Sequence, residues 1–181
     1  MGGTSVAYHL AELGEKDVIL LDRNELTSGS TFHSAGLVGQ LRADPTLTLM
    51  NMHSVDLYRK LQQTETPPSW RECGSIKLAS TPERMQEIRR QIGWAKTFGL
   101  DLKEISPKEA QDLFPLIDLE GVVGACYMAS DGQVDPSQLA MALAAGARRQ
   151  GVQIFTHTRV LEIKTTNGRV SSVVTDKGEI E

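Results

Sequence analysis

The fold class is decided by GTSVAYHLAELGEKDVILLDR, residues 3–23. The first half places apolar residues at helical spacing from Val6 to Leu13, and Gly14 stands where a helix would end. The second half, DVILLDR, is a continuous apolar run that is typical of a strand buried on both faces of a parallel sheet. A helix followed at once by such a strand predicts an α/β fold.

The same stretch contains half of a dinucleotide-binding pattern. In the full pattern, the last glycine lets a helix pack close to its strand, the helix N-terminus faces a pyrophosphate, and an acid about 20 residues later binds the ribose hydroxyls. Gly3 and Asp22 have this spacing, but the sequence does not contain the preceding strand and glycines. The residues alone leave open a nucleotide site or an ordinary helix–strand unit that ends in a solvated aspartate.

Both ends of the sequence suggest a longer protein. The chain opens inside an expected helix, and it ends with DKGEIE, residues 176–181, after an expected turn. We therefore expect a fragment that lacks the first strand and the C-terminal part of its sheet domain. Because strands next to the missing ones would be unpaired, we expect residues 1–181 alone to hold a cofactor poorly.

The rest of the chain predicts a three-part organisation. Residues 1–43 begin a sheet domain, residues 44–130 form an inserted α+β region, and residues 131–181 complete the sheet domain with a β-meander. Further helices are expected over 44–63, 81–98, 107–114 and 136–150, and further strands over 75–80, 121–128, 152–157, 159–166 and 169–176. Asn167-Gly168 is the strongest hairpin signal in the chain.

Composition excludes several classes of partner. The net charge is −4 and the basic residues form no stripe, so nucleic acid is not expected as a partner. No apolar run is long enough to cross a bilayer, so no membrane association is expected. Cys73 and Cys126 lie far apart in no CxxC arrangement, and we expect two buried free thiols.

The loop after the Asp22 strand is LTSGSTFHSAGLVGQLR, residues 26–42, with His33 at its centre. A lone loop histidine is most often exposed or structural, and the hydroxyl side chains of such a loop can bond to nearby backbone. In open α/β sheets, however, ligands lie outside the carboxyl ends of the strands. The residues leave open whether this is a surface loop or a ligand loop.

Two other candidate sites are weaker. DGQVDP, residues 131–136, contains two acids that could form an acid–base pair, but Asp131-Gly132 is typical of a turn and Asp135 of a helix cap. We expect the turn and the cap. No two of the four histidines have the spacing of metal ligands, so no metal site is predicted.

Taken together, these residues resemble the FAD-dependent amine oxidoreductases of the D-amino-acid oxidase fold, and within them the dimethylglycine and sarcosine dehydrogenase group. The opening stretch carries the resemblance together with ELTSGSTFHSAGLVGQLR, GSIKLAS, DGQVDPSQLAMALAAGARRQGVQI and VVTDKGEIE. It covers essentially the whole chain. It implies an FAD/NAD(P)-binding Rossmann-like domain of the glutathione-reductase type, with an inserted α+β substrate domain.

The resemblance also implies where the cofactor binds. The family motif has the form GSTWHAAGL, and its histidine attaches covalently to the 8α-methyl of FAD. Here Phe32 replaces the usual Trp, Ser34 replaces the frequent Ala, and the histidine falls on His33. The implied cofactor-binding residues are Met1, Gly2, Gly3, Asp22, Arg23, Gly29, Ser30, Thr31, Phe32, His33, Ser34, Ala35, Gly36, Leu37 and Val160.

The implied reaction is oxidative demethylation of dimethylglycine or sarcosine. Hydride would pass from the N-methyl group to FAD, and the one-carbon unit would leave as formaldehyde or pass to tetrahydrofolate bound by a region beyond Glu181. Electron-transfer flavoprotein would accept the electrons in mitochondrial members. The implied location is the mitochondrial matrix in a eukaryote and the cytoplasm in a bacterium. No catalytic acid or base can be named within the sequence.

Two alternatives remain within the resemblance. The group includes a regulatory subunit of pyruvate dehydrogenase phosphatase, a non-catalytic protein that this sequence resembles in GTSVAYHL, GVQI and TDKGEIE. That subunit is expected to lack a histidine at the attachment position, so His33 favours the enzyme. The third interpretation is a non-covalent FAD amine or amino-acid oxidase, in which His33 plays no part.

Overall fold

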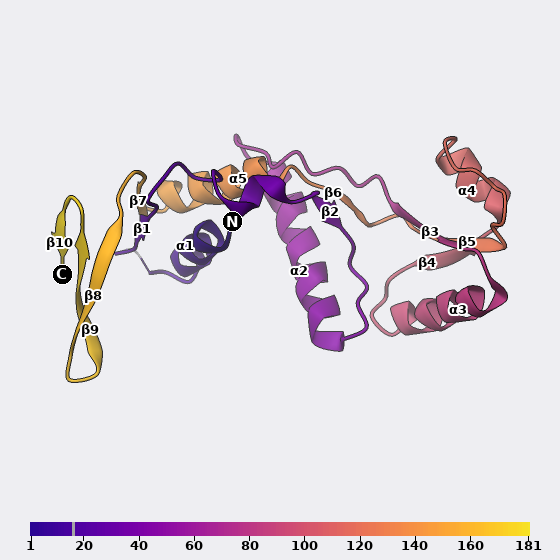
Figure 1. Ribbon diagram of the computed structural model, residues 1–181, viewed down its shortest axis with the longest axis horizontal. Coiled ribbons are helices and arrows are strands. Elements are labelled where there is room, and N and C mark those ends of the chain that lie inside the picture. Colours follow the sequence, from indigo (N-terminus) through magenta and orange to yellow (C-terminus); the bar gives the residue numbers. More distant parts are fainter. Residues whose placement is uncertain (16) are drawn as a thin grey trace. The chain divides into compact units, whose positions relative to one another are not determined.

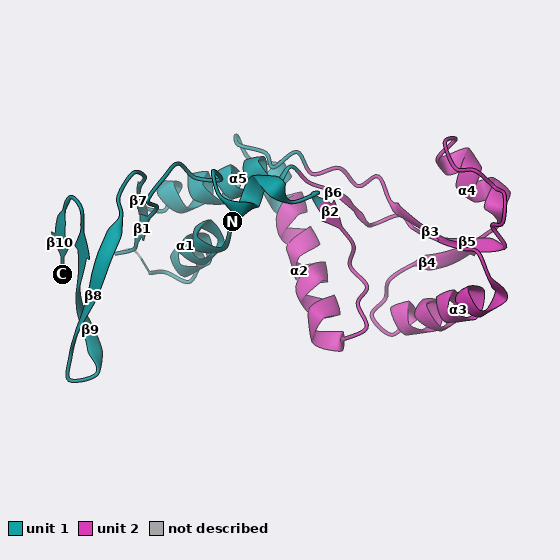
Figure 2. Cartoon of the chain, in the orientation of Figure 1, with its two compact units in different colours: residues 1–36, 60–69, 135–181 teal, residues 37–59, 70–134 magenta. Residues whose placement is uncertain are grey.

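The computed structural model describes residues 1–15 and 17–181. These residues form two compact units (Figure 2): unit 1 comprises 1–36, 60–69 and 135–181, and unit 2 comprises 37–59 and 70–134. The three-part domain division predicted from the sequence stays a prediction. Figure 1 labels the elements along the chain.

Unit 1 begins with the predicted helix and strand. Helix α1 (Gly2–Glu12) leads to strand β1 (Ile19–Leu21), which pairs in parallel with β7 (Gln153–Phe155). This arrangement confirms the α/β fold class and the parallel pairing. The expectation that β1 is buried on both faces is wrong: Ile19 is 39% exposed, because β1 and β7 form a two-stranded sheet among the described residues.

Helix α5 (Pro136–Arg149) has the predicted ends. Asp135 caps it, with Oδ1 accepting from the Ser137 nitrogen at 2.8 Å and from the Gln138 nitrogen at 2.9 Å. After the helix, Gly151 adopts a φ of +99°, which a glycine adopts without strain. Both signals of the sequence are thereby confirmed.

Helices α1 and α5 pack closely through small residues (Figure 1). Ala7 and Ala11 of α1 are buried, and a Cβ added at Gly146 of α5 would lie 2.6 Å from Cε2 of Tyr8. That separation is far below ordinary van der Waals contact, so the Tyr8 ring lies directly on the backbone of α5. The interface therefore depends on the absence of a side chain at Gly146.

The end of unit 1 is a β-meander in the order β10-β9-β8. The predicted hairpin is confirmed: β8 (Val160–Thr166) and β9 (Arg169–Thr175) are joined by Asn167 and Gly168, whose φ angles are +54° and +75°. Strand β10 (Gly178–Ile180) also pairs with β9, although the sequence predicts no strand there. Positive φ at both turn residues matches the turn type that short hairpins prefer.

Unit 2 is built around an antiparallel sheet with the order β3-β5-β4. The sheet strands are β3 (Ser75–Ala79), β4 (Leu102–Ile105) and β5 (Gly124–Met128); a separate pair is formed by β2 (Leu37–Val38) and β6 (Gly132–Gln133). The helices are α2 (Pro45–Gln62, whose last residues belong to unit 1), α3 (Pro82–Lys96) and α4 (Pro107–Leu113). The capping box of α4, between Ser106 and Glu109, is confirmed. Strands β2, β4 and β6 were not predicted.

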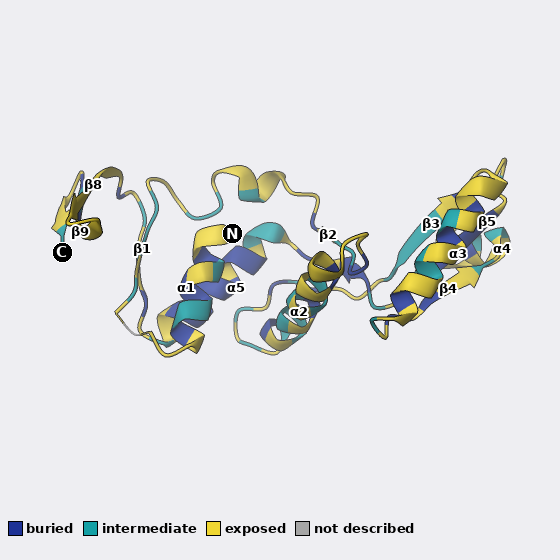
Figure 3. Cartoon of the chain, turned by 90° about the horizontal axis from the view of Figure 1, so that it is seen from below, coloured by how far each residue is buried: buried dark blue, intermediate teal, exposed yellow. Residues whose placement is uncertain are grey.

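The core of unit 2 lies between α3 and the sheet. Ile88 of α3, Ala79 of β3 and Cys126 of β5 are all 0% exposed. Buried and exposed stretches alternate along α3 in Figure 3, as expected for a helix with one face on a sheet.

Cys73 is exposed, so the expectation of two buried thiols is wrong for this residue, and both cysteines are free. Within the described residues, no helix is long and apolar enough to cross a membrane.

Candidate cofactor site

Among the described residues, the first backbone amides of α1 have no hydrogen-bond partner. Met1 precedes the helix without a side-chain cap, and the first backbone bond of the helix is donated by the Ser5 nitrogen to the Met1 oxygen at 2.9 Å. The amides of Gly2, Gly3 and Thr4 come before that bond, at the positive end of the helix dipole. Three of the sequence-predicted residues, Met1 to Gly3, thus lie at a helix start, where backbone amides can donate to an anion.

Gly3 sets the distance between α1 and β1. A Cβ added at Gly3 would lie 3.0 Å from Cδ1 of Leu20, the middle residue of β1. A larger residue would require the Leu20 side chain to shift, and the pattern inferred from the sequence assigns such close helix–strand packing to the last glycine of the dinucleotide fingerprint. The residues present therefore fit a nucleotide at this helix start.

A cavity of about 460 Å³ opens at the carboxyl end of β1. It is lined by Leu21, Asp22, Arg23, Thr158, Arg159 and Val160. Asp22 is fixed through its backbone, because its nitrogen donates to the Phe155 oxygen and its own oxygen accepts from the Thr158 nitrogen, each at 2.9 Å. The predicted pair Asp22 and Arg23 thus meets the predicted Val160, which is far along the sequence, in one cavity.

The carboxylate of Asp22 has one oxygen that is available as a hydrogen-bond acceptor. Its Oδ1 accepts from the Asn24 nitrogen at 2.9 Å, and within the described part of the chain Oδ2 accepts no hydrogen bond. A carboxylate with an open oxygen beside a cavity can accept bonds from a pair of ribose hydroxyls. The donor set therefore fits the adenosine part of a dinucleotide.

Sequence reasoning missed two residues of this cavity, Thr158 and Arg159. Thr158 is buried and donates through Oγ1 to the Thr156 oxygen at 3.1 Å, while the Arg159 nitrogen donates to Oδ1 of Asp176 at 2.9 Å. The signal that could have found them is their position, immediately before Val160 in the turn that leads into β8. Arg159 adds a positive charge to the cavity wall.

The segment 29–36 lies next to the start of α1. Its central residues form the short 3-10 helix η1 (Ser30–His33), and Oγ1 of Thr31 accepts from the Met1 nitrogen at 3.1 Å. This bond joins two groups of predicted residues that are 30 positions apart in the sequence. Gly29 precedes η1, and the segment ends at the buried Gly36, whose φ is +70°.

His33 is exposed at the end of η1. Its ring centroid lies 3.9 Å from that of Phe32, with the ring planes inclined at 33°, and Phe32 is itself 55% exposed. Within the described part of the chain, the imidazole makes no hydrogen bond, and its flanking residues Ser34 and Ala35 are exposed as well. Both ring nitrogens of His33 are therefore open to a reaction partner.

One predicted residue falls outside this cluster. Leu37 begins β2 in unit 2 and is 79% exposed, whereas the other candidates all belong to unit 1.

Asp131 has a structural function that the sequence did not reveal. It is only 5% exposed; Oδ1 accepts from the Gln40 nitrogen at 2.9 Å, and Oδ2 accepts from the Ser75 hydroxyl at 2.7 Å. A carboxylate used in this way ties the segment after β2 to the start of β3. The expected turn at Asp131-Gly132 is wrong by about two residues, because the turn lies at 129–130 and Gly132 begins β6. Asp131 is instead a buried acceptor.

Comparison with known proteins gives consistent matches along the whole chain. A family model described as FAD dependent oxidoreductase (DAO) matches residues 1–181. The mitochondrial pyruvate dehydrogenase phosphatase regulatory subunit of Mus musculus is 38% identical over 180 residues, which cover 99% of this chain and 20% of that protein. The mitochondrial dimethylglycine dehydrogenase of Homo sapiens is 38% identical over 182 residues, covering 98% of this chain and 21% of that protein.

A solved structure shares the fold over nearly the same range. L-proline dehydrogenase from P. horikoshii has a TM-score of 0.91 and 29% sequence identity, covering 98% of this chain and 47% of that one. The chain spans about a fifth of the length of the two curated relatives above and about half of this solved chain.

Proposed function

The chain belongs to the family of FAD-dependent oxidoreductases (DAO), and from this premise we propose that the protein binds FAD and oxidises an N-methylated amino acid. The observation that carries the proposal is His33, an exposed imidazole with open nitrogens on a segment hydrogen-bonded to the start of α1. Support for the substrate class comes from the identity to dimethylglycine dehydrogenase.

Three groups of residues would hold FAD. The first amides of α1, at Gly2 and Gly3, would donate to its pyrophosphate. Asp22 would accept from the ribose hydroxyls, and the backbone of Val160 would contact the adenine. The segment from Gly29 to Leu37 would line the flavin. Each of these assignments follows from the family pattern and fits the open donors and acceptors described above.

His33 would hold the flavin through a covalent bond from an imidazole nitrogen to the 8α-carbon. The methyl group would lose one C–H bond, with a proton leaving and the flavin ring taking up the electron pair. An imidazole that is exposed and free of internal hydrogen bonds can approach this methyl group without breaking a contact of the fold. Phe32, whose ring lies beside that of His33, would keep an aromatic surface next to the flavin. Covalent attachment would fix one orientation of the cofactor, which is the protein's main contribution in such enzymes.

Bound FAD would supply a hydride acceptor for the N-methyl group of dimethylglycine or sarcosine. The oxidised N-methyl carbon would then be released by water as formaldehyde or transferred to tetrahydrofolate outside these 181 residues. We further propose electron-transfer flavoprotein as the electron acceptor and the mitochondrial matrix as the location if the source is eukaryotic, because the curated relatives above are mitochondrial. The residues of this chain hold and orient the cofactor, and no catalytic acid or base is assigned to them.

Acid precipitation of the complete protein tests the attachment. We expect yellow flavin to precipitate with the polypeptide in the wild type and to stay in the supernatant in His33→Ala. Ser34→Ala, which changes the neighbouring exposed residue, is the matched control and should keep the flavin attached. Wild-type flavin found in the supernatant would contradict the covalent bond and favour the non-covalent oxidase.

A second candidate function is regulation of pyruvate dehydrogenase phosphatase. It is favoured by the 38% identity to the regulatory subunit, which equals the identity to dimethylglycine dehydrogenase. His33 supports the enzyme instead. A panel of N-methyl amines with an artificial electron acceptor separates the two: turnover of dimethylglycine or sarcosine supports the enzyme, and no turnover of any amine supports the regulatory protein.

A further inference from the structure

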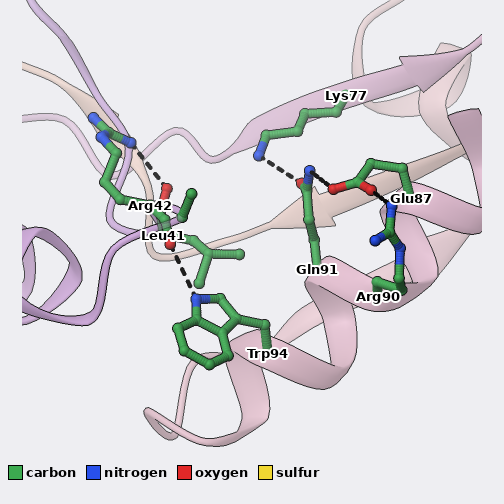
Figure 4. A pocket seen from close by; sticks show the side chains of 8 residues that line it. Leu41, Arg42, Lys77, Glu87, Arg90, Gln91 and Trp94 are labelled. Carbon is green, nitrogen blue, oxygen red and sulfur yellow. Dashed lines mark hydrogen bonds and ion pairs between the residues drawn. The ribbon is translucent and has the colours of Figure 1, made fainter.

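Unit 2 contains a cavity of about 400 Å³ that no candidate cofactor residue lines (Figure 4). It lies between the segment after β2, the strand β3 and helix α3, and its lining residues are Leu41, Arg42, Ala43, Lys77, Glu87, Arg90, Gln91 and Trp94. This volume is within the usual range for small-molecule sites. The chemistry of the lining residues indicates which molecule it would accept.

The cavity is positively charged although the chain is not. It is lined by three basic residues and one acid, whereas the whole chain has a net charge of −4. The single acid, Glu87, is already paired with Arg90. Within the described part of the chain, Lys77 and Arg42 form no ion pair with a carboxylate. The guanidinium of Arg42 donates to the Leu41 oxygen at 3.0 Å and points away from Lys77 (Figure 4), so Lys77 supplies the cavity with its unneutralised positive charge.

Lys77 is the better placed of these two cations. Its side chain is half-buried, and among the residues that the structure describes its Nζ donates to one acceptor, the neutral Oε1 of Gln91, at 3.2 Å. Gln91 in turn donates from Nε2 to Oε1 of Glu87 at 3.2 Å, so the amide is held in one orientation (Figure 4). A partly desolvated ammonium with a neutral acceptor gains more from an added anion than a fully solvated one does.

The other wall of the cavity is apolar. Leu41 contributes an aliphatic side chain, and Trp94 contributes an indole that is 36% exposed. The indole Nε1 is occupied, because it donates to the Arg42 oxygen at 3.0 Å. Trp94 therefore offers the cavity a ring surface and no polar group, which suits the hydrocarbon part of a ligand.

We propose that this cavity binds a small organic carboxylate with an aromatic or branched apolar body. The carboxylate would accept from Lys77 Nζ, and the body would pack against Trp94 and Leu41. Dimethylglycine and sarcosine do not fit this description, since their ammonium would lie in a cavity that already contains the Lys77 ammonium and they have no apolar body. The site thus goes beyond the proposed oxidation and does not depend on FAD.

Titration calorimetry of the complete protein with 3-phenylpropionate tests the proposal, with the uncharged 3-phenylpropionamide as the second ligand. We expect the acid to bind and the amide not to bind. Lys77→Met, which keeps the length of the side chain and removes its charge, should weaken binding about ten-fold. Trp94→Leu should weaken it by a similar factor through the apolar wall.

The matched control is Lys103→Met, because Lys103 of β4 is exposed, pairs with Asp101 and does not line the cavity. It should bind as the wild type does, as should Lys77→Arg, which retains the charge. Thermal unfolding of each variant verifies that it is folded. The proposal is overturned by equal binding of the acid and the amide, by unchanged affinity in Lys77→Met and Trp94→Leu, by displacement with sarcosine, or by no binding at all. None of these results depends on flavin content or amine turnover, so they leave the proposed oxidation untouched.

Discussion

Unit 1 and unit 2 both contain helices and strands, but the buried side chains lie between a helix and a sheet in unit 2 and between two helices in unit 1. In unit 2 the side chains between α3 and the sheet are fully buried, with Ile88, Ala79 and Cys126 at 0% exposure. In unit 1 the contact between α1 and α5 is buried, whereas η1 and the whole of β8 are not. The exposed segment η1, which is proposed to bind the flavin, is therefore separate from the buried α1–α5 contact that stabilises unit 1.

This difference predicts how substitutions act in each unit. A change in the core of unit 2 should cost stability, and a change in the exposed segment of unit 1 should cost only ligand binding. A change in the α1–α5 contact should fall between them. The predictions below test this order, from the largest effect on the free energy of unfolding to the smallest.

Ile88→Ala should have the largest effect. Ile88 is 0% exposed between α3 and the sheet, so its truncation removes buried methyl groups and leaves a cavity, at a cost of about 2–5 kcal/mol. Urea unfolding measures the loss, and amide hydrogen exchange should accelerate in α3 and β5. Val123→Ala, at a residue that is 52% exposed, should stay within about 0.5 kcal/mol. Equal losses in the two variants would show that unit 2 has no well-packed core.

Asp131→Ala should come next, at about 2–3 kcal/mol, because it leaves the buried donors of Gln40 and Ser75 without their acceptor. The measurement is again urea unfolding. Asp101→Ala removes an exposed ion pair with Lys103 and should cost no more than about 1 kcal/mol. If the two aspartate variants unfold at the same urea concentration, the hydrogen bonds that Asp131 accepts do not stabilise unit 2.

Gly146→Ala tests the α1–α5 contact. The new methyl group would overlap the Tyr8 ring, which we expect to destabilise unit 1 by about 1–3 kcal/mol. Gly93 of α3 is the matched control, because a Cβ there meets nothing within 4 Å. Gly93→Ala should therefore stabilise the protein by about 0.5–1 kcal/mol. Thermal unfolding of the two variants should shift in opposite directions, and a shift in the same direction would refute the close contact.

His33→Ala should have the smallest effect on stability, within about 0.5 kcal/mol, because the side chain is exposed and makes no hydrogen bond with the described residues. This holds for unfolding measured without flavin. A large loss of stability in the flavin-free protein would mean that His33 supports the fold, and the separation between fold and cofactor residues in unit 1 would fail.

The elements that the sequence predicts correctly are those with local signals. Helix α5 has its cap at Asp135 and its stop at Gly151, and the hairpin has Asn167-Gly168, all within a few residues of the element that they define. Strands β2 and β6 have two residues each and exist only because Leu37 pairs with Gln133, far along the chain. No local sequence pattern predicts such a pair of strands. Strand β4 was missed because only Leu102 of its four residues is buried.

In the candidate site, too, residues that belong to one local unit could be predicted from the sequence, and residues brought in by distant pairing could not. Gly3 and Asp22 are visible in the sequence because their spacing reflects one helix–strand unit. Val160 enters the same cavity only because β1 pairs with β7, so its place followed from the resemblance and not from any local pattern. Asp131 was underestimated for a related reason, since its partners Gln40 and Ser75 are 91 and 56 residues away.

The two cysteines of unit 2 allow the rate at which its core opens to be measured. Cys73 is exposed, whereas burial raises the pKa of the Cys126 thiol and keeps it in the unreactive protonated form. A thiol reagent should therefore modify Cys73 within its mixing time and reach Cys126 only when β5 separates from α3. The rate of the second modification then reports how often the core around Cys126 opens under native conditions, without any denaturant.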